Sequence, residues 1–343
     1  MALFQSFDTN QAQDRKHRSQ SVKNGGTGYV KQIISLLRHV PLRYIDHEYV
    51  TSSMIMKLST QTKLSIARCL LAVATVWRKL TGDSSPTVVC KRRGVKWNLD
   101  LNQGIDLAIY IFGAFERDTA KALLRLAKPG MVVLDIGANI GAHTLPLAAH
   151  IGKEGRLIAI EPSDWAYEKL LTNLGLNPEL QTIVTPVQAA LIGTTGLQPS
   201  EFYASWDLNT VTGSHPIHGG QLRSSSGAKY VTLDNLVSDL SLPSVDLIKL
   251  DVDGFECEVL RGARKTLQQY TPPIVMELCP DIHEEVLSSS FDELVTLLDT
   301  LGYSYADEVR FRPLPSNCDA LRALIPEGGG INVIAIPKGM TLP

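Results

Sequence analysis

The chain has 343 residues, of which 44% are hydrophobic, 6% aromatic and 20% charged, and its formal net charge is −2. This length allows one large domain with an appendage and an ample hydrophobic core. The near-neutral charge, with no cluster of basic and aromatic residues, gives no electrostatic case for nucleic-acid binding.

Two segments precede the regular alternation of strands and helices. Residues 1–28 are rich in Gln, Asn, Ser and Lys, so we expect a disordered arm. Residues 29–86 have a helical pattern whose second helix stops before Gly82. Its apolar stripe consists of Ile66, Leu70, Val73, Trp77 and Leu80. We expect this segment either to lie on the main domain or to serve as a homodimer contact or a lid over the substrate.

The cysteines and the apolar segments help to predict the cellular compartment of the protein. The five cysteines are odd in number and lack C-x-x-C spacing, which indicates reduced thiols. The polar N-terminus has no apolar signal core. The longest apolar segment, Leu64 to Trp77, is interrupted by Arg68 and is too short to cross a bilayer. We therefore expect a cytoplasmic protein that does not associate with a membrane.

Residues 87–343 alternate between strand and helix patterns, which is typical of an α/β fold with a parallel sheet and right-handed crossovers. The predicted strands are 131–136, 157–161, 183–190, 245–251, 273–279, 302–306 and 331–337. Pro186 lies inside the third strand and is tolerated only at a sheet edge, because proline has no N–H to donate.

The first two strands end in motifs suited to a nucleoside. D-I-G-A-N-I-G (135–141) follows the first strand, and Glu161 ends the second. Glycines allow close backbone approach to a ligand, and an acid at the second strand tip can accept the hydroxyls of a ribose. Asp135 would repel a pyrophosphate but attract ammonium and sulfonium groups. S-adenosylmethionine carries both cations and a ribose diol.

Two other interpretations of these motifs remain open. An NAD(P)-dependent oxidoreductase would use G-x-G-x-x-G, and here the third glycine is missing and Asp135 precedes the turn. A non-catalytic protein that binds a nucleoside, or an α/β turn that binds nothing, would not require acids and glycines at all of these positions.

A third acidic motif, Asp251-Val-Asp253-Gly, follows the fourth strand. The two acids are two residues apart and share one side if the strand continues. They could bind a divalent metal, act as a base, or neutralise Lys249. We predict no metal site, because no nearby histidine or third ligand completes it. We expect Asp251 to contact the cofactor or the reacting centre, and Asp253 to be either catalytic or structural.

A long Gly- and Ser-rich segment, residues 212–227, has the length of a lid or substrate loop. It contains His215 and His218, which we predict as first and second candidates for the general base. The alternative is that they are solvated bystanders.

From about Gly94 to the C-terminus the chain resembles the FkbM family of class I S-adenosylmethionine-dependent methyltransferases. The resemblance rests on four segments: G-V-K-W-N-L-D-L with I-Y-I-F-G-A-F-E, D-I-G-A-N-I-G, I-E-P-S, and D-L-I-K-L-D-V-D-G-F-E-C-E-V-L-R-G-A. The chain departs from the family at Asp253, where the family usually has Glu.

The resemblance implies a seven-stranded Rossmann-like sheet of order 3-2-1-4-5-7-6, with the last strand antiparallel, and an N-terminal helical extension. By resemblance, Glu116 faces the methionine end of the cofactor; a solvated acid at the start of a helix is the alternative. The predicted catalytic residues are Asp251, His215 and Asp253. The predicted cofactor-binding residues are Glu116, Asp135, Gly137, Ala138, Asn139, Gly141, Glu161, Pro162, Ser163, Ala190 and Asp251.

The expected activity is transfer of a methyl group from S-adenosylmethionine, giving S-adenosylhomocysteine. The acceptor atom follows from the resemblance alone: a hydroxyl of a small molecule such as a sugar or a secondary metabolite. A carboxyl or nitrogen acceptor is the alternative within the same fold.

Overall fold

The computed structural model describes residues 60–80, 82, 85–193, 201–204, 208, 221–286 and 291–343. The chain divides into two compact units, Met1–Ile66 and Ala67–Pro343. The expected arm, residues 1–28, lies outside the described residues, and so does most of the first unit. Helix α3, Thr60–Leu80, covers the predicted apolar stripe. Two members of that stripe, Val73 and Leu80, are exposed.

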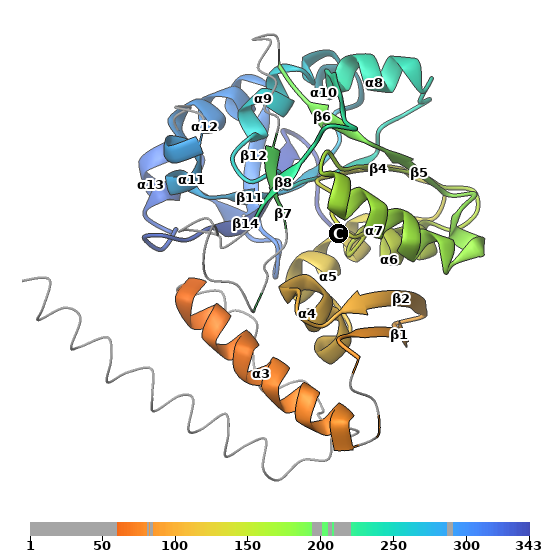
Figure 1. Cartoon of the computed structure of the whole chain (residues 1–343). Coiled ribbons are helices and arrows are strands. Elements are labelled where there is room, and N and C mark those ends of the chain that lie inside the picture. The colour runs from red at the N-terminus through yellow and green to blue at the C-terminus, as the bar shows by residue number, and fades with distance from the viewer. Residues whose placement is uncertain are drawn as a thin grey trace, which may run out of the picture. The chain divides into compact units, whose positions relative to one another are not determined.

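An eight-stranded sheet organises the second unit (Figure 1). Its strands from edge to edge are β13 (Pro313–Leu314), β12 (Tyr303–Asp307), β14 (Ile331–Pro337), β11 (Ile274–Leu278), β10 (Leu247–Leu250), β3 (Val132–Ile136), β4 (Arg156–Ile160) and β5 (Val184–Val187). The predicted order 3-2-1-4-5-7-6 is confirmed, with the short β13 added beyond the sixth strand. The last strand, β14, is antiparallel to both of its neighbours, as expected.

The third predicted strand is split in two. β5 forms the sheet edge, so Pro186 has the edge position that its missing N–H requires. β6 (Ala189–Leu191) leaves the sheet and pairs in parallel with β9 (Lys229–Val231).

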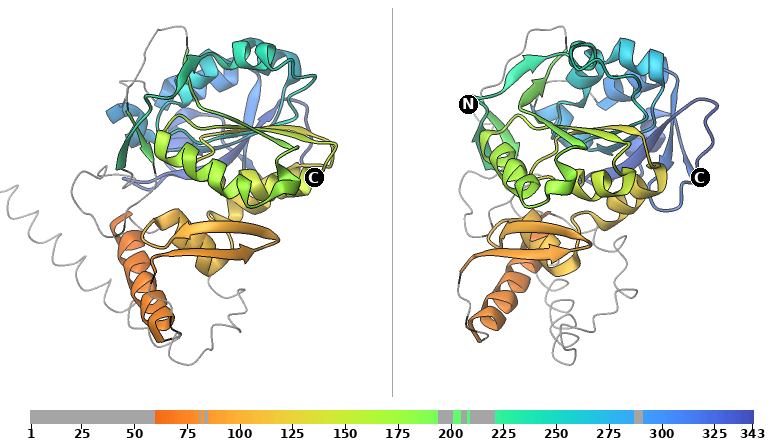
Figure 2. Two further views of the ribbon diagram at one scale, coloured as in Figure 1. Left: turned by 45° about the vertical axis from the view of Figure 1, so that its right-hand side comes forward. Right: turned by 90° about the vertical axis from the view of Figure 1, so that its right-hand side faces the viewer.

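Helices cover both faces of the sheet (Figure 2). One layer contains α5 (Arg117–Leu126), α6 (Thr144–Ile151) and α7 (Asp164–Gly175), and the other contains α8 (Leu233–Asp239), α10 (Arg264–Tyr270) and α12 (Phe291–Thr300). Alternate strand residues such as Leu134, Ile158 and Met276 join the second layer in one core. The opposite face therefore carries Asp135, Lys249 and Glu277.

The remaining described elements are β1 (Thr87–Arg92), β2 (Val95–Asp100), α4 (Gly104–Phe112), the 3-10 helix Pro178–Leu180, β7 (Glu201–Ala204), β8 (Gln221–Ser224), α9 (Glu256–Arg261), α11 (Pro280–Val286) and α13 (Cys318–Arg322). Over the described residues, no helix is both long and apolar enough to cross a membrane.

Strands β1 and β2 form a hairpin that the sequence analysis does not anticipate. Its two-residue turn, Arg93-Gly94, has positive φ at both positions (47° and 87°), the geometry that follows the twist of a hairpin. The outer edge of β2 is satisfied by α7 and the turn after it: the side-chain oxygens of Asn173 and Asn177 accept from the backbone N–H groups of Asn98 (2.8 Å) and Lys96 (2.9 Å).

Candidate active site

The turn after β3 brings its backbone against the end of β10. Gly137 has φ +78°, and a Cβ built on it would lie 1.8 Å from the carbonyl oxygen of Asp251. Only glycine fits this approach. The N–H groups of Gly137 and Ala138 both donate to the carbonyl of Ile160, at 2.9 and 3.0 Å. The turn is thereby fixed between the ends of β4 and β10.

Glu161 at the end of β4 is buried and already bound by the protein. Its Oε2 accepts from the N–H of Asn139 (2.9 Å), and its Oε1 accepts from the N–H (2.9 Å) and hydroxyl (2.6 Å) of Ser163. A carboxylate has about four lone-pair positions, so one position on Oε2 is left for a ribose hydroxyl. Burial raises the pKa of Glu161, against these hydrogen bonds.

Lys249 joins the first and third acidic motifs. Its Nζ lies 3.6 Å from Oδ1 of Asp135 and 3.3 Å from Oδ2 of Asp251, and it donates to the carbonyl of Gly137 at 2.7 Å. Burial alone would lower the pKa of this lysine, but the two carboxylates outweigh burial and raise it. Lys249 therefore stays charged and neutralises its neighbours.

The two acids beside Lys249 differ in access. Asp135 is fully buried and accepts from the hydroxyl of Thr144 at 2.6 Å, whereas the side chain of Asp251 is 31% exposed. Asp251 is thus the acid that a ligand can contact, whereas Asp135 is buried and forms an ion pair with Lys249.

Asp253 does not continue the strand. β10 ends at Leu250 and Asp253 has φ +49°, so the condition under which Asp251 and Asp253 were expected to share one side, a strand that continues to Asp253, is not met. The backbone turns here, and the N–H of Val252 donates to Glu256 Oε1 at 3.2 Å. Burial, and then the charges of Asp251 and Glu256, raise the pKa of Asp253 well above its ordinary value.

Two further acids belong to this region and were missed in the sequence. Glu256 lies 3.3 Å from Nε2 of His283, and both side chains are buried. Glu277 lies near the end of β11, one residue after Met276, which pairs with Leu250, so Glu277 flanks Asp251. Burial, followed by the charges of Asp251 and Glu116, raises the pKa of Glu277 well above its ordinary value. Its place at the carboxyl end of the fifth strand was the signal that could have identified it.

Glu116 caps the start of α5 with φ +40°. Its Oε2 lies 3.8 Å from Nε2 of His143, and its side chain is 35% exposed. The charge of Glu116 contributes to the raised pKa of Lys249, so this acid faces the same cluster. Its contact with the methionine end of the cofactor stays a prediction.

Asp164, the first residue of α7, accepts four hydrogen bonds, one from near the end of the third predicted strand and three from the end of β8 and the segment after it. It accepts from Gln188 Nε2 (2.7 Å), from the hydroxyls of Ser224 (2.7 Å) and Ser226 (3.0 Å), and from the N–H of Gly227 (3.0 Å). The hydroxyl of Ser224 is the main reason that the pKa of Asp164 is lowered. Gln188 is therefore committed to Asp164.

For the other predicted residues the structure gives local conformation and burial. Gly141 has φ +88°, and Ala190 is buried in β6. Pro162 is half-buried between Glu161 and Ser163. The candidate bases His215 and His218 lie outside the described residues. Within the described ranges, no group of three or more His, Cys, Asp or Glu residues has the geometry of a metal site.

This donor set fits S-adenosylmethionine. Asp251 and Glu116 are partly exposed acids suited to its ammonium and sulfonium groups, and Glu161 has an acceptor position for its ribose. The backbone of the Gly137 turn lies between Asp251 and Glu161.

Several known proteins are similar to this chain. The hexuronic acid methyltransferase AglP of Haloferax volcanii is 29% identical over 163 residues, which is 47% of this chain and 61% of that protein. Methyltransferase sdnD of Sordaria araneosa is 25% identical over 170 residues, or 42% of this chain and 65% of that protein. The chain thus matches less than two thirds of each relative's length.

Among solved structures, an FkbM methyltransferase from Methylobacillus flagellatus KT aligns with 15% identity and a TM-score of 0.37, covering 61% of this chain and 44% of that one. The Methyltransferase FkbM domain matches residues 135–305, from the acid before the Gly137 turn to β12. The match includes Asp251 and the whole D-V-D-G motif. This chain belongs to the FkbM methyltransferase family.

Proposed function

We propose that this chain transfers the methyl group of S-adenosylmethionine to a hydroxyl of a small molecule, with a sugar as the preferred class. One observation carries the proposal: the Gly137 turn, Glu161 and Asp251 lie at the carboxyl ends of three adjacent strands, β3, β4 and β10. The turn contacts both acids, because Gly137 packs against the carbonyl of Asp251 and the N–H of Asn139 donates to Glu161. The choice of a sugar is supported by the relative named as a hexuronic acid methyltransferase.

The cofactor would supply an electrophilic methyl carbon on a positively charged sulfur. With the cofactor held by Glu161, the Gly137 turn and Asp251, that methyl group would pass to the acceptor oxygen while the carbon–sulfur electron pair stayed on sulfur, and the hydroxyl proton would pass to a basic side chain or to water. Most of the acceleration in such an in-line displacement comes from alignment, worth roughly 7–11 kcal/mol, whereas a general base adds about 10²- to 10⁴-fold.

The described residues would align the two reactants and compensate the positive charge of the cofactor. Asp251 offers a partly exposed carboxylate whose position is fixed by Lys249. Glu277 beside it can accept a hydrogen bond from the acceptor hydroxyl, and its raised pKa brings it toward the range of a general base. His215 remains the predicted base from the substrate loop.

Titration calorimetry with S-adenosylhomocysteine and with NAD, in parallel, tests the cofactor. We expect binding of the first and not of the second, because Asp135 and the Gly137 turn do not form a pyrophosphate site. Binding of NAD alone would replace the proposal with an oxidoreductase.

Replacing Asp251 tests the chemistry. Asp251→Asn is nearly isosteric and removes the charge next to the sulfonium, so we expect turnover to fall by about 10²-fold or more. The matched control is Asp239→Asn, at the end of α8. Turnover is measured by release of S-adenosylhomocysteine, and wild-type turnover in Asp251→Asn would exclude this residue from the reaction.

Addition of EDTA should leave turnover unchanged, whereas a loss of turnover that magnesium restores would make Asp251 and Asp253 metal ligands.

A further inference from the structure

Strands β7 and β8 form an antiparallel ribbon outside the main sheet. Phe202 of β7 pairs with Arg223 of β8, so these two side chains leave the ribbon on the same side. The ring of Phe202 lies 5.1 Å from the ring of Phe255, two residues after Asp253. The side of the ribbon that carries Arg223 therefore faces the loop of the acidic motif.

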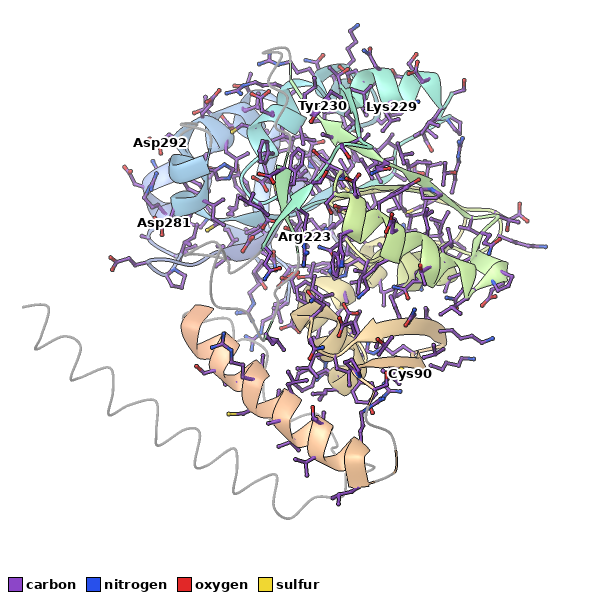
Figure 3. All side chains as sticks on the ribbon, in the orientation of Figure 1. Cys90, Arg223, Lys229, Tyr230, Asp281 and Asp292 are labelled. Atoms are coloured by element: carbon purple, nitrogen blue, oxygen red, sulfur yellow. The ribbon has the colours of Figure 1, made fainter. Side chains whose placement is uncertain are left out.

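The opposite anchor of the ribbon is α7. Ser224, next to Arg223, donates to Asp164 at 2.7 Å. The guanidinium carbon of Arg223 lies 4.9 Å from the ring centre of Trp165. Arg223 is thus held between the segment that follows Glu161 and the segment that follows Asp251. Figure 3 labels Arg223.

Within the part of the chain that the structure describes, the guanidinium of Arg223 has no polar partner. Its Nε is buried without an acceptor, and no hydrogen bond or ion pair within the described residues involves its guanidinium. Removing a charge from water without a partner is costly, so such a group is normally paired. Lys169 also stacks on Trp165, but it is paired with Asp106.

The other described arginines that stack on aromatic rings are all hydrogen-bonded. Arg92 donates to the carbonyl of Tyr110 at 2.8 Å, and Arg125 donates to the carbonyl of Val309 at 3.1 Å. Arg78 and Arg322 likewise have oxygen acceptors, at 3.0 and 3.4 Å. Stacking on a ring does not therefore explain why Arg223 lacks an acceptor.

We propose that Arg223 binds an anionic group, a carboxylate or a phosphate, on the methyl acceptor, with Trp165 holding the guanidinium in place. The planar fork of arginine matches both anions. This inference rests on the proposed function and narrows its acceptor to an acidic small molecule. Since Asp251 and Glu116 are partly exposed acids of this site, a cation on the ribbon would offset their repulsion of an acidic acceptor.

The test uses three sugars as probes: glucuronate, glucose 6-phosphate and neutral glucose. Each is titrated into the full chain saturated with S-adenosylhomocysteine. We expect at least one anionic probe to bind about tenfold more tightly than glucose, the size of effect that a charge-assisted hydrogen bond gives. Arg223→Gln should abolish the preference, and Arg223→Lys should retain part of it because the charge remains.

Lys229→Gln is the matched control, since it removes one exposed cation from β9, close in sequence to Arg223 (Figure 3). It should keep the preference, and thermal unfolding should confirm that all variants fold. Equal affinity of wild type for all three probes, binding of none of them, or a preference that survives Arg223→Gln would overturn the proposal.

The carboxylate of the cofactor is the other anion that Arg223 could meet. Arg223→Gln should leave the affinity for S-adenosylhomocysteine unchanged, so a variant that loses that affinity but keeps the probe preference would overturn the proposal in favour of the cofactor. Wild type that fails to bind S-adenosylhomocysteine would instead refute the proposed function, which is a separate result.

Discussion

At the scale of single residues, exposure and neighbours decide what each carboxyl group can do. Asp135 and Asp251 are both within 4 Å of Lys249, yet only Asp251 has access to a ligand. Glu161 is buried like Asp135, but three donors on its two oxygens leave one acceptor position open. Similar acids at neighbouring strand ends therefore have different roles.

Replacing Glu161 should weaken cofactor binding. Glu161→Ala removes an acceptor for the ribose and also the bonds that hold Asn139 and Ser163, so we expect the affinity for S-adenosylhomocysteine to fall at least about tenfold. Calorimetry measures this loss. Ser163→Ala is the control, because it removes the 2.6 Å hydroxyl bond but keeps the carboxylate. Unchanged affinity in a folded Glu161→Ala protein would remove this residue from the ribose site.

At the scale of elements, the site depends on how strands end. β3 and β10 run side by side, and the turn after β3 touches the carbonyl of Asp251, the first residue after β10, because residue 137 has no side chain. The backbone then turns at Asp253, which has φ +49°. The positions of Asp251 and of the cofactor turn are thus coupled through backbone contact.

Gly137→Ala should disturb both stability and cofactor binding. A residue with a side chain at positive φ costs about 1–3 kcal/mol, and here the added Cβ would also collide with the Asp251 carbonyl. Gly130→Ala is the matched control: its φ is +84°, and a Cβ there meets nothing within 4 Å. Denaturant unfolding should show the larger loss at Gly137, and only that variant should lose affinity for S-adenosylhomocysteine. Equal losses would mean that the close approach has no energetic role.

At the scale of the whole molecule, buried carboxyl groups make the free energy of unfolding depend on pH. Burial raises the pKa of Glu161, Asp253, Glu256, Glu277 and Glu308. In each case the folded protein holds its proton to higher pH than the unfolded chain. The stabilising contribution of each of these groups is therefore greatest below its unfolded pKa, near 4.3 for glutamate, and is lost as pH rises through its folded pKa.

Glu308 allows the contribution of one buried carboxyl group to this pH dependence to be tested. It accepts from the hydroxyl of Thr119 at 2.8 Å, and that hydroxyl accepts from Asn332 at 3.0 Å, which joins α5 to β12 and β14. Burial raises the pKa of Glu308 to about 8. The free energy of unfolding of the wild type should fall between pH 5 and pH 8, because the unfolded chain releases this proton first.

Glu308→Gln keeps the oxygen that faces Thr119 and cannot ionise. We expect it to reduce the loss between pH 5 and pH 8 by about 1–3 kcal/mol, measured by denaturant unfolding. Glu154→Gln, at an exposed carboxyl, is the control and should leave the pH dependence unchanged. A wild-type slope in Glu308→Gln would show that this group is ionised in the folded state.

The sequence by itself determined the main strands, the edge position of Pro186, the glycine turn and the acids at the strand ends. These features follow from local rules: apolar runs form buried strands, glycine permits the turn at Gly137, and proline cannot pair on both sides. The order of the strands came from resemblance to a family, and the pairing in the structure agrees with it.

Only the tertiary structure decided which charges meet. The ion pair of Lys249 with Asp135, the pairing of Glu256 with His283, and the place of Glu277 beside Asp251 join residues that are 26 to 114 positions apart. The unpaired guanidinium of Arg223 is likewise visible only when its surroundings are known. Burial and distance set the strength of every such interaction, and neither is a property of a residue's neighbours along the chain.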